Sequence, residues 1–264
     1  GMDAISKFVQ QQLPALQVVW GRFFFHMLMM ILAAMVLHRQ RELLYPKRPG
    51  LQFMRSFILM CITISFYLAI REVSLADAAA VQFTAPVLVT LMAGVLLKEH
   101  LHWRKIIAVA LGFTGTLIII RPGSASYNPF ILLAAISAVC MAAYFIMTRY
   151  LSRHEHVMTT IFYSPVAGAI LLLPVLTAVW ISPSLSEWLL LVAMGTLGAS
   201  GHLLLTWAFH HADASVLSPL LNSQLVAAAF FSAWIFSDRL EWWFYAGAAL
   251  IITASVLVSA SKKQ

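Results

Sequence analysis

Two pairs of ionisable side chains near the N-terminus are spaced so that, in a helix, the two members of each pair lie on the same face. Asp3 and Lys7 are four residues apart, and so are Arg22 and His26. An ionisable side chain inside a membrane costs at least roughly 2.5 to 3.5 kcal/mol, so residues of this kind in apolar segments are candidates for function. A guanidinium can hold a carboxylate through two parallel hydrogen bonds. We predict a polar cluster of these four residues in which Arg22 binds the carboxylate of a ligand.

A structural role for the same cluster stays open. If a helix ends near Gln10 and the next begins near Pro14, Asp3 and Arg22 lie at nearly the same depth, because Arg22 is eight residues or about 12 Å into the second helix. Asp3 would then neutralise Arg22 and hold the two helices together.

Polar and aromatic residues in later apolar segments form a second candidate set. An amide inside a helix bundle can bind a ligand, or it can form an interhelical hydrogen bond, which contributes about 0.6 kcal/mol on average. Asn222 and Gln224 point to different faces of one helix, so at most one of them is expected to face a ligand. The predicted ligand-binding residues of this set are Tyr67, Gln82, His202, Trp207, Asn222 and Gln224.

The elements that must position these residues are long apolar helices. The chain has 264 residues, of which 61% are hydrophobic and 10% are charged, whereas soluble domains have roughly 25% charged residues. This composition excludes a water-soluble domain and predicts an all-α, polytopic membrane helix bundle. Nine complete spans are expected at 14–37, 51–70, 75–97, 103–120, 129–149, 157–180, 186–209, 214–236 and 242–260.

The net charge of +7 is concentrated at one set of helix ends. Twelve Lys and Arg residues lie at these ends, and only Arg71, Arg121 and Arg239 lie at the opposite ends. Basic residues mark cytoplasmic loops, so the charge predicts topology and does not indicate a nucleic-acid partner. The C-terminus is expected to be cytoplasmic. The twelve residues are Arg39, Arg41, Lys47, Arg48, Arg55, Lys98, Arg104, Lys105, Arg149, Arg153, Lys262 and Lys263.

Two short blocks of sequence recur along the chain. KEHLHW (98–103) matches SDRLEW (237–242) at an offset of 139, and LADAAA (75–80) matches HADASV (211–216) at an offset of 136. The copies are five spans apart, an odd number, so they must insert with opposite orientations, as in many secondary transporters. Chance similarity among apolar helices is the alternative. Lys7-Phe8 aligns with Arg149-Tyr150 at an offset of 142. Because the sixth helix starts near Pro129, a first helix is expected to start about 13 residues before Gly1, so that this chain lacks most of it.

These features resemble the drug/metabolite transporter superfamily, EamA type. The resemblance rests on Arg22-Phe23, on Pro86 in the fourth helix, on an acidic residue after the fourth and ninth helices (Glu99, Asp238), and on the Gly-rich stretch 110–122. Asp238 departs from the glutamate usual in the second repeat, and Asn222 or Gln224 stands where the first repeat has Pro86.

The resemblance implies an inverted repeat of five plus five helices, with residues 1–122 as the first EamA-like repeat and 123–264 as the second. It implies a multi-pass inner-membrane transporter that moves a small polar metabolite, such as an amino acid or a vitamin, by alternating access. No cofactor is implied, and no enzyme activity is expected. The sequence has no G-x-x-x-x-G-K-[ST] loop. Membrane lipid is an expected partner, and a homodimer is left open.

Two other functions are kept as alternatives. One is a passive membrane channel. The other is a membrane-embedded metal enzyme, because the chain has nine histidines, several of them at helix ends. Metal ligands on one helix face need spacings of three or four, and these histidines occur as H-x-H and H-H. We therefore expect no metal site.

Overall fold

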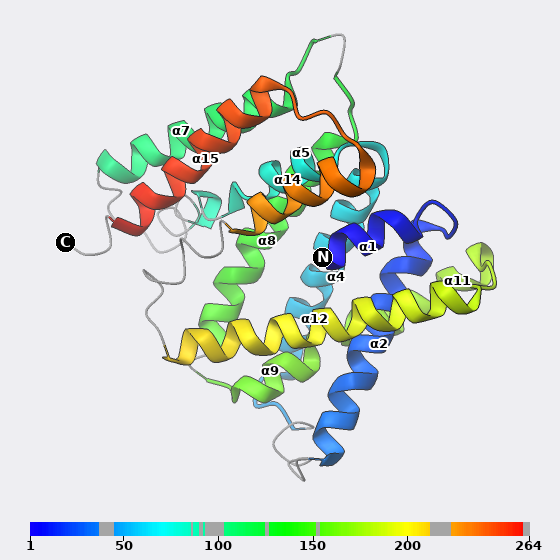
Figure 1. Cartoon of the computed structure of the whole chain (residues 1–264). Coiled ribbons are helices and arrows are strands. Elements are labelled where there is room, and N and C mark those ends of the chain that lie inside the picture. Colours follow the sequence, from blue (N-terminus) through cyan, green and yellow to red (C-terminus); the bar gives the residue numbers. More distant parts are fainter. Residues whose placement is uncertain are drawn as a thin grey trace. The chain divides into compact units, whose positions relative to one another are not determined.

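The computed structural model describes residues 1–36, 45–85, 87–89, 92, 103–124, 127–151, 154–211 and 223–260 (Figure 1). These residues form α-helices and connecting turns without a strand, so the all-α prediction is confirmed for them. In chain order the helices are α1 (Met2–Val9), α2 (Ala15–Val36), α4 (Pro49–Glu72), α5 (Leu75–Gln82), α7 (Trp103–Ile120), α8 (Ile131–Leu151), α9 (Val157–Tyr163), α10 (Val166–Leu171), α11 (Leu173–Val179), α12 (Leu185–His211), α14 (Ser223–Phe236) and α15 (Trp242–Ala260).

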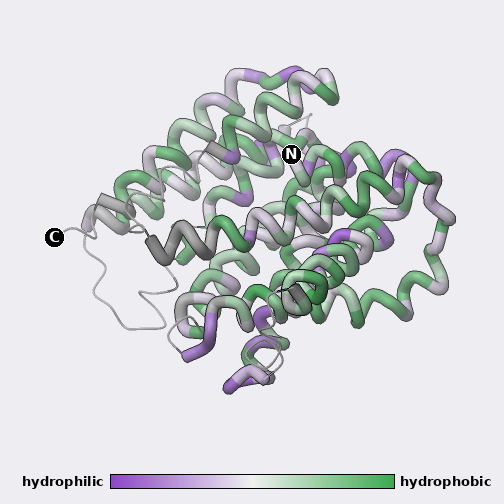
Figure 2. The backbone as a smooth tube through the Cα atoms, turned by 60° about the horizontal axis from the view of Figure 1, so that its bottom comes forward, coloured by the Kyte–Doolittle hydropathy of each residue, from purple (hydrophilic) through white to green (hydrophobic). Residues whose placement is uncertain are grey.

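Several of these helices are long and apolar enough to cross a membrane. Among the described residues there are four such helices, or five if a bent pair is counted as one span. Shorter apolar helices include Ile106–Ile120, Gln224–Phe236 and Trp242–Leu257. Figure 2 shows that hydrophobic residues predominate along the helices. The chain is a multi-pass membrane helix bundle, as its composition predicts.

The segment 157–180 differs from the single span that the sequence predicts. It is divided into α9, α10 and α11, and the axis bends by 42° between Met158–Leu171 and Leu173–Val179. Pro165 stands between α9 and α10, and Pro174 lies in the first turn of α11. Proline has no N–H to donate, and its ring clashes with the carbonyl four residues earlier, so a helix breaks or kinks there.

The described residues divide into two compact units. One unit contains Gly1 and the described residues within 68–143 and 209–264, and the other contains the described residues within 2–67 and 144–208. In the first unit α7 and α15 lie side by side (Figure 1). A Cβ on Gly115 would lie 2.7 Å from the Gly247 carbonyl oxygen, and a Cβ on Gly247 would lie 2.6 Å from the Gly115 carbonyl oxygen. Only glycine allows this close approach of two helices.

α7 and α15 run antiparallel. Gly115 of α7 lies against Gly247 of α15, and Ala108, seven residues earlier in α7, belongs to one buried cluster with Ala254, seven residues later in α15. An inverted repeat requires this relation between its fifth and tenth helices. The assignment of the whole chain to two repeats, 1–122 and 123–264, stays a prediction.

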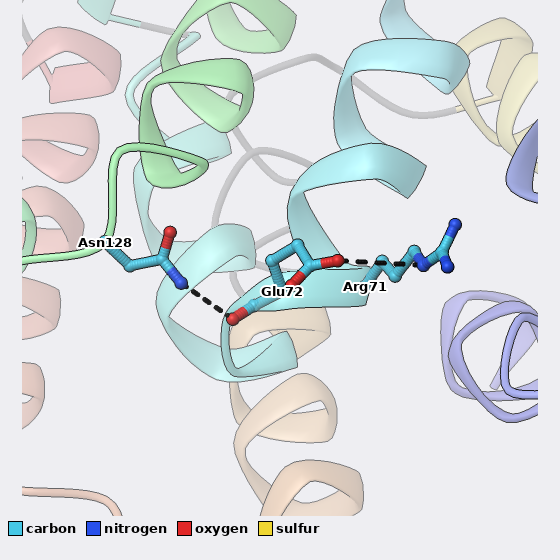
Figure 3. A network of polar contacts seen from close by, with 3 residues as sticks. All are labelled: Arg71, Glu72 and Asn128. Atoms are coloured by element: carbon cyan, nitrogen blue, oxygen red, sulfur yellow. Dashed lines mark hydrogen bonds and ion pairs between the residues drawn. The ribbon is translucent and has the colours of Figure 1, made fainter.

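Polar contacts fix the end of α4 in the same unit (Figure 3). The Asn128 side-chain Nδ2 donates to the Glu72 main-chain carbonyl oxygen over 2.9 Å, and the Phe130 backbone N–H donates to the Asn128 side-chain Oδ1 over 3.0 Å. Arg71 forms an ion pair with Glu72 at 3.7 Å. Asn128 thus satisfies a free carbonyl at the end of α4 and positions the turn that begins α8.

In the second unit α2 packs against α9, α10 and α11. A Cβ on Gly168 would lie 2.2 Å from the Phe23 ring, and a Cβ on Gly195 would lie 2.4 Å from Phe25 Cβ. The Trp20 indole N–H donates to the Ala169 carbonyl over 3.1 Å. These close contacts hold the middle of α2 between α10 and α12, and this part of α2 carries Arg22 and His26.

Candidate functional site

Arg22 is buried in the middle of α2, with 7% of its surface exposed. Its Nη1 donates to the Thr63 hydroxyl oxygen over 2.7 Å, and that hydroxyl donates to the Leu59 carbonyl over 2.9 Å. The guanidinium lies 5.7 Å from the Tyr67 ring centroid and 5.3 Å from the Phe23 ring centroid. These contacts orient the guanidinium but leave its Nε without a hydrogen-bond partner.

His26 and Tyr67 bring two further unpartnered polar atoms to this cluster. Each side chain is 1% exposed, and neither His26 Nε2 nor the Tyr67 hydroxyl has a partner in hydrogen-bond geometry. The Tyr67 hydroxyl approaches Ser6 and Arg22 without meeting that geometry. The His26 ring stacks on His202, with centroids 5.7 Å apart. Buried polar atoms almost always have a partner, so unpartnered ones point to bound water or a ligand.

The start of α1 lies beside this cluster. Asp3 is half-buried and close enough to Arg22 for their charges to interact. Met2 places its Sδ 3.5 Å from the position of a Cβ on Gly198, a residue that also faces Arg22 and His26. Lys7 is half-buried one turn further along α1. The structure therefore brings together Asp3, Arg22, His26, Tyr67 and His202, which the sequence analysis singled out.

The other predicted site residues are placed differently. Gln82 belongs to the first unit, where its side-chain amide donates to the Ser137 hydroxyl over 2.7 Å and joins α5 to α8. This contact is an interhelical hydrogen bond of the kind that the packing explanation requires. Gln224 is exposed on α14. Asn222 and Pro86, and the side chain of Trp207, lie outside the described residues.

Arg55 is a buried residue of a helix, whereas the sequence analysis predicts a loop charge at the cytoplasmic surface. It is counted above among the cytoplasmic loop charges, but it lies inside α4 with 3% of its surface exposed. Its Nε donates to the Thr148 hydroxyl over 2.9 Å, its Nη1 to the Thr160 carbonyl over 2.8 Å, and its Nη2 to the Tyr144 hydroxyl over 2.6 Å. Both Nη atoms also lie 3.2 Å from the Ser164 hydroxyl oxygen.

Sequence reasoning missed Arg55, Thr63 and Gly198 as parts of the polar interior. Arg55 lies near the start of an apolar run, where basic residues usually mark a membrane boundary. Thr63 and Gly198 are ordinary residues of membrane helices. Their partners are on other helices, 41 residues away in the case of Thr63 and Arg22.

Chemically, the cluster offers a fixed cation with a free N–H, an imidazole nitrogen and a phenol. These groups can bind a carboxylate through charge-assisted hydrogen bonds. Within the part of the chain that the structure describes, no group of three His, Cys, Asp or Glu side chains is placed to hold a metal ion.

The fold and this cluster define a class of protein: an integral membrane protein with a buried polar site among its helices. The chain matches the EamA-like transporter family over residues 2–121 and again over residues 128–260. It belongs to this family.

Named relatives in the family are transporters. The S-adenosylmethionine uptake transporter of Rickettsia felis is 27% identical over 262 residues, which cover 99% of this chain and 88% of the relative. The riboflavin transporter of Brucella anthropi is 32% identical over 198 residues, or 71% of this chain and 68% of the relative. The pseudopaline exporter of Pseudomonas aeruginosa is 28% identical over 272 residues, which cover 99% of this chain and 92% of the relative.

A solved crystal structure of another protein has the same fold. It superposes with a TM-score of 0.65 at 20% sequence identity, and the match covers 99% of this chain and 95% of the other.

Proposed function

We propose that this membrane protein moves a small, carboxylate-bearing metabolite by alternating access, and that Arg22 binds the carboxylate. The observation that carries the proposal is the unpartnered Nε of a buried arginine whose other end is held by Thr63. A guanidinium fixed in this way has little rotamer entropy left to lose on binding. The free Nε–H can donate to a carboxylate oxygen.

Asp3 suggests that the cargo also carries a positive charge. Asp3 lies on α1 near Arg22, and in this proposal its carboxylate binds the ammonium group of an amino-acid-like ligand while Arg22 binds the carboxylate. The named cargoes of the relatives include S-adenosylmethionine, a compound with such a zwitterionic end. This parallel supports an amino-acid-like cargo.

Family membership favours a carrier over the two alternatives, a passive channel and a metal enzyme. Carriers and channels differ in two measurable properties: a carrier exchanges labelled substrate against an inside pool, and its rate saturates. Counterflow in proteoliposomes therefore separates them. Uptake that rises linearly with concentration and shows no counterflow would establish a channel.

The first test is a thermal-stability screen of the purified protein, because a ligand that binds only the folded state raises its melting temperature. S-adenosylmethionine, L-methionine, L-glutamate and succinate are the carboxylate probes, and riboflavin is a probe without a carboxylate. L-methionine methyl ester keeps the ammonium group and serves as the matched compound without a carboxylate, and 5′-methylthioadenosine serves as a comparison that lacks the whole amino-acid end. We expect a carboxylate to stabilise the protein and its matched compound to have no effect. Equal stabilisation by both members of a pair would contradict the role given to Arg22.

We also propose that the protein lies in the inner membrane with its C-terminus in the cytoplasm. Without the buried Arg55, eleven Lys and Arg residues lie at the helix ends that we assign to the cytoplasm, and three lie at the opposite ends. A bias of this size sets the orientation of a membrane protein. A C-terminal green fluorescent protein fusion should fluoresce, and a C-terminal alkaline phosphatase fusion should be inactive. An active phosphatase fusion would reverse the proposed topology.

A further inference from the structure

Gly198 on α12 is a buried glycine that helix packing does not explain. A Cβ at this position would find Met2 Sδ at 3.5 Å, His26 Nδ1 at 3.8 Å and Arg22 Nε at 3.9 Å, which are ordinary contact distances. Gly195, one turn earlier, is different, because a Cβ there would lie 2.4 Å from Phe25 Cβ and 2.8 Å from the His26 backbone nitrogen. Packing requires a glycine at 195 and leaves room for alanine at 198.

A glycine in the interior of a helix lowers the stability of the helix relative to alanine, because glycine loses more backbone entropy on folding. Gly198 has this disadvantage without a close contact to offset it. The space that its missing side chain leaves is bordered by Arg22 Nε and by the His26 ring. Arg22 Nε is the buried donor that lacks a partner. The absent methyl group therefore leaves space, bordered also by Met2 Sδ, next to this unpartnered atom.

We infer that Gly198 is a specificity-determining residue, and this inference rests on the proposed function. The carboxylate of the cargo lies against the bare backbone of α12 at Gly198 while one of its oxygens accepts from Arg22 Nε. Such a charge-assisted contact needs an oxygen at about 2.7–2.9 Å from the nitrogen. A methyl group at Gly198 would lie 3.9 Å from Nε and would compete with this oxygen for the space beside the nitrogen.

The inference predicts opposite effects of Gly198→Ala on stability and on binding. The unliganded variant should melt no lower than the wild type, because alanine favours the helix and fits the available space. Its affinity for the carboxylate probes should fall about tenfold or more, since a hydrogen bond to a charged group is lost. A residue with a purely structural role would not show lower affinity together with unchanged or higher stability.

Gly201→Ala is the matched control. Gly201 lies on the same helix and is exposed, and a Cβ there would have nothing within 4 Å. This variant gains the same helix propensity and should keep wild-type affinity.

The experiment measures the melting temperature of the wild type and both variants, without ligand and over concentration series of S-adenosylmethionine, L-methionine, L-glutamate and succinate. Wild-type affinity in Gly198→Ala would overturn the role of Gly198 and leave the proposed function intact. A lower melting temperature of the unliganded Gly198→Ala variant would show that packing does require this glycine, and would also overturn the inference. If no carboxylate stabilises the wild type, the proposed function itself fails.

Discussion

Arg22→Gln is expected to abolish transport and to weaken binding of the carboxylate cargo by about a hundredfold or more, because truncating one partner of a buried, hydrogen-bonded charge pair costs roughly 2–5 kcal/mol. Glutamine keeps a polar group near Thr63 but removes the cation and its Nε–H donor. The measurements are counterflow in proteoliposomes and the ligand-induced shift in melting temperature. Unchanged transport would remove Arg22 from the binding site.

A double variant separates binding from the structural explanation, in which Asp3 neutralises Arg22. If neutralisation were the only role, Asp3→Asn combined with Arg22→Gln would remove both charges together and restore stability and transport. If Arg22 binds the cargo, the double variant regains stability but stays inactive. Thr63→Val provides a milder comparison, because it removes the hydroxyl that orients Arg22 and keeps the guanidinium. We expect it to weaken binding by about tenfold, the effect of one hydrogen bond to a charged group.

Arg55→Leu is expected to destabilise the folded protein by about 3 kcal/mol or more, because hydrogen bonds to a charged group contribute roughly 1.5–3 kcal/mol each and are only partly additive. The guanidinium joins α4 to the C-terminal half of α8 through Tyr144 and Thr148, and to α9 through the Thr160 carbonyl. It also lies over the Tyr144 ring, 4.6 Å from the centroid. Leucine removes all of these contacts and leaves the Tyr144 hydroxyl without its donor.

Arg71→Leu is the matched control on the same helix. The Arg71 side chain is 51% exposed and has an ion pair with the neighbouring Glu72, and exposed pairs of this kind contribute little. The substitution should change stability by no more than about 0.5 kcal/mol. Thermal unfolding in detergent, monitored by intrinsic fluorescence, compares the two variants. Equal melting temperatures would show that the buried contacts of Arg55 do not stabilise this fold.

A double-mutant cycle with Tyr144→Phe measures one of these contacts directly. The phenylalanine keeps the ring beneath the guanidinium and removes only the hydroxyl that accepts from Nη2. The single variant should lose about 1 kcal/mol, and its effect should largely disappear in an Arg55→Leu background, because the hydrogen bond is already absent there. Fully additive effects would mean that the two residues do not interact in solution.

The sequence by itself was sufficient for the fold class and for part of the site. An apolar run of about 20 residues predicts a membrane helix whatever surrounds it, because each run must satisfy its own backbone hydrogen bonds. The pairing of Arg22 with His26 is equally local, since residues four apart share a helix face. The breaks at Pro165 and Pro174 were also encoded locally, but a hydropathy pattern alone does not register them.

The tertiary structure decided which helices meet and therefore which polar groups have partners. Nothing local to Thr63 indicates that its hydroxyl holds Arg22, and nothing local to Arg55 distinguishes a loop charge from a buried cation bound to α8 and α9. The sequence around Gly195 and Gly198 does not distinguish their roles. In the structure Phe25 packs directly against Gly195, whereas Gly198 faces the unpartnered Nε of Arg22. Hydrogen bonding and packing between distant segments depend on distances that helix periodicity does not determine, so these distinctions exist only in the folded chain.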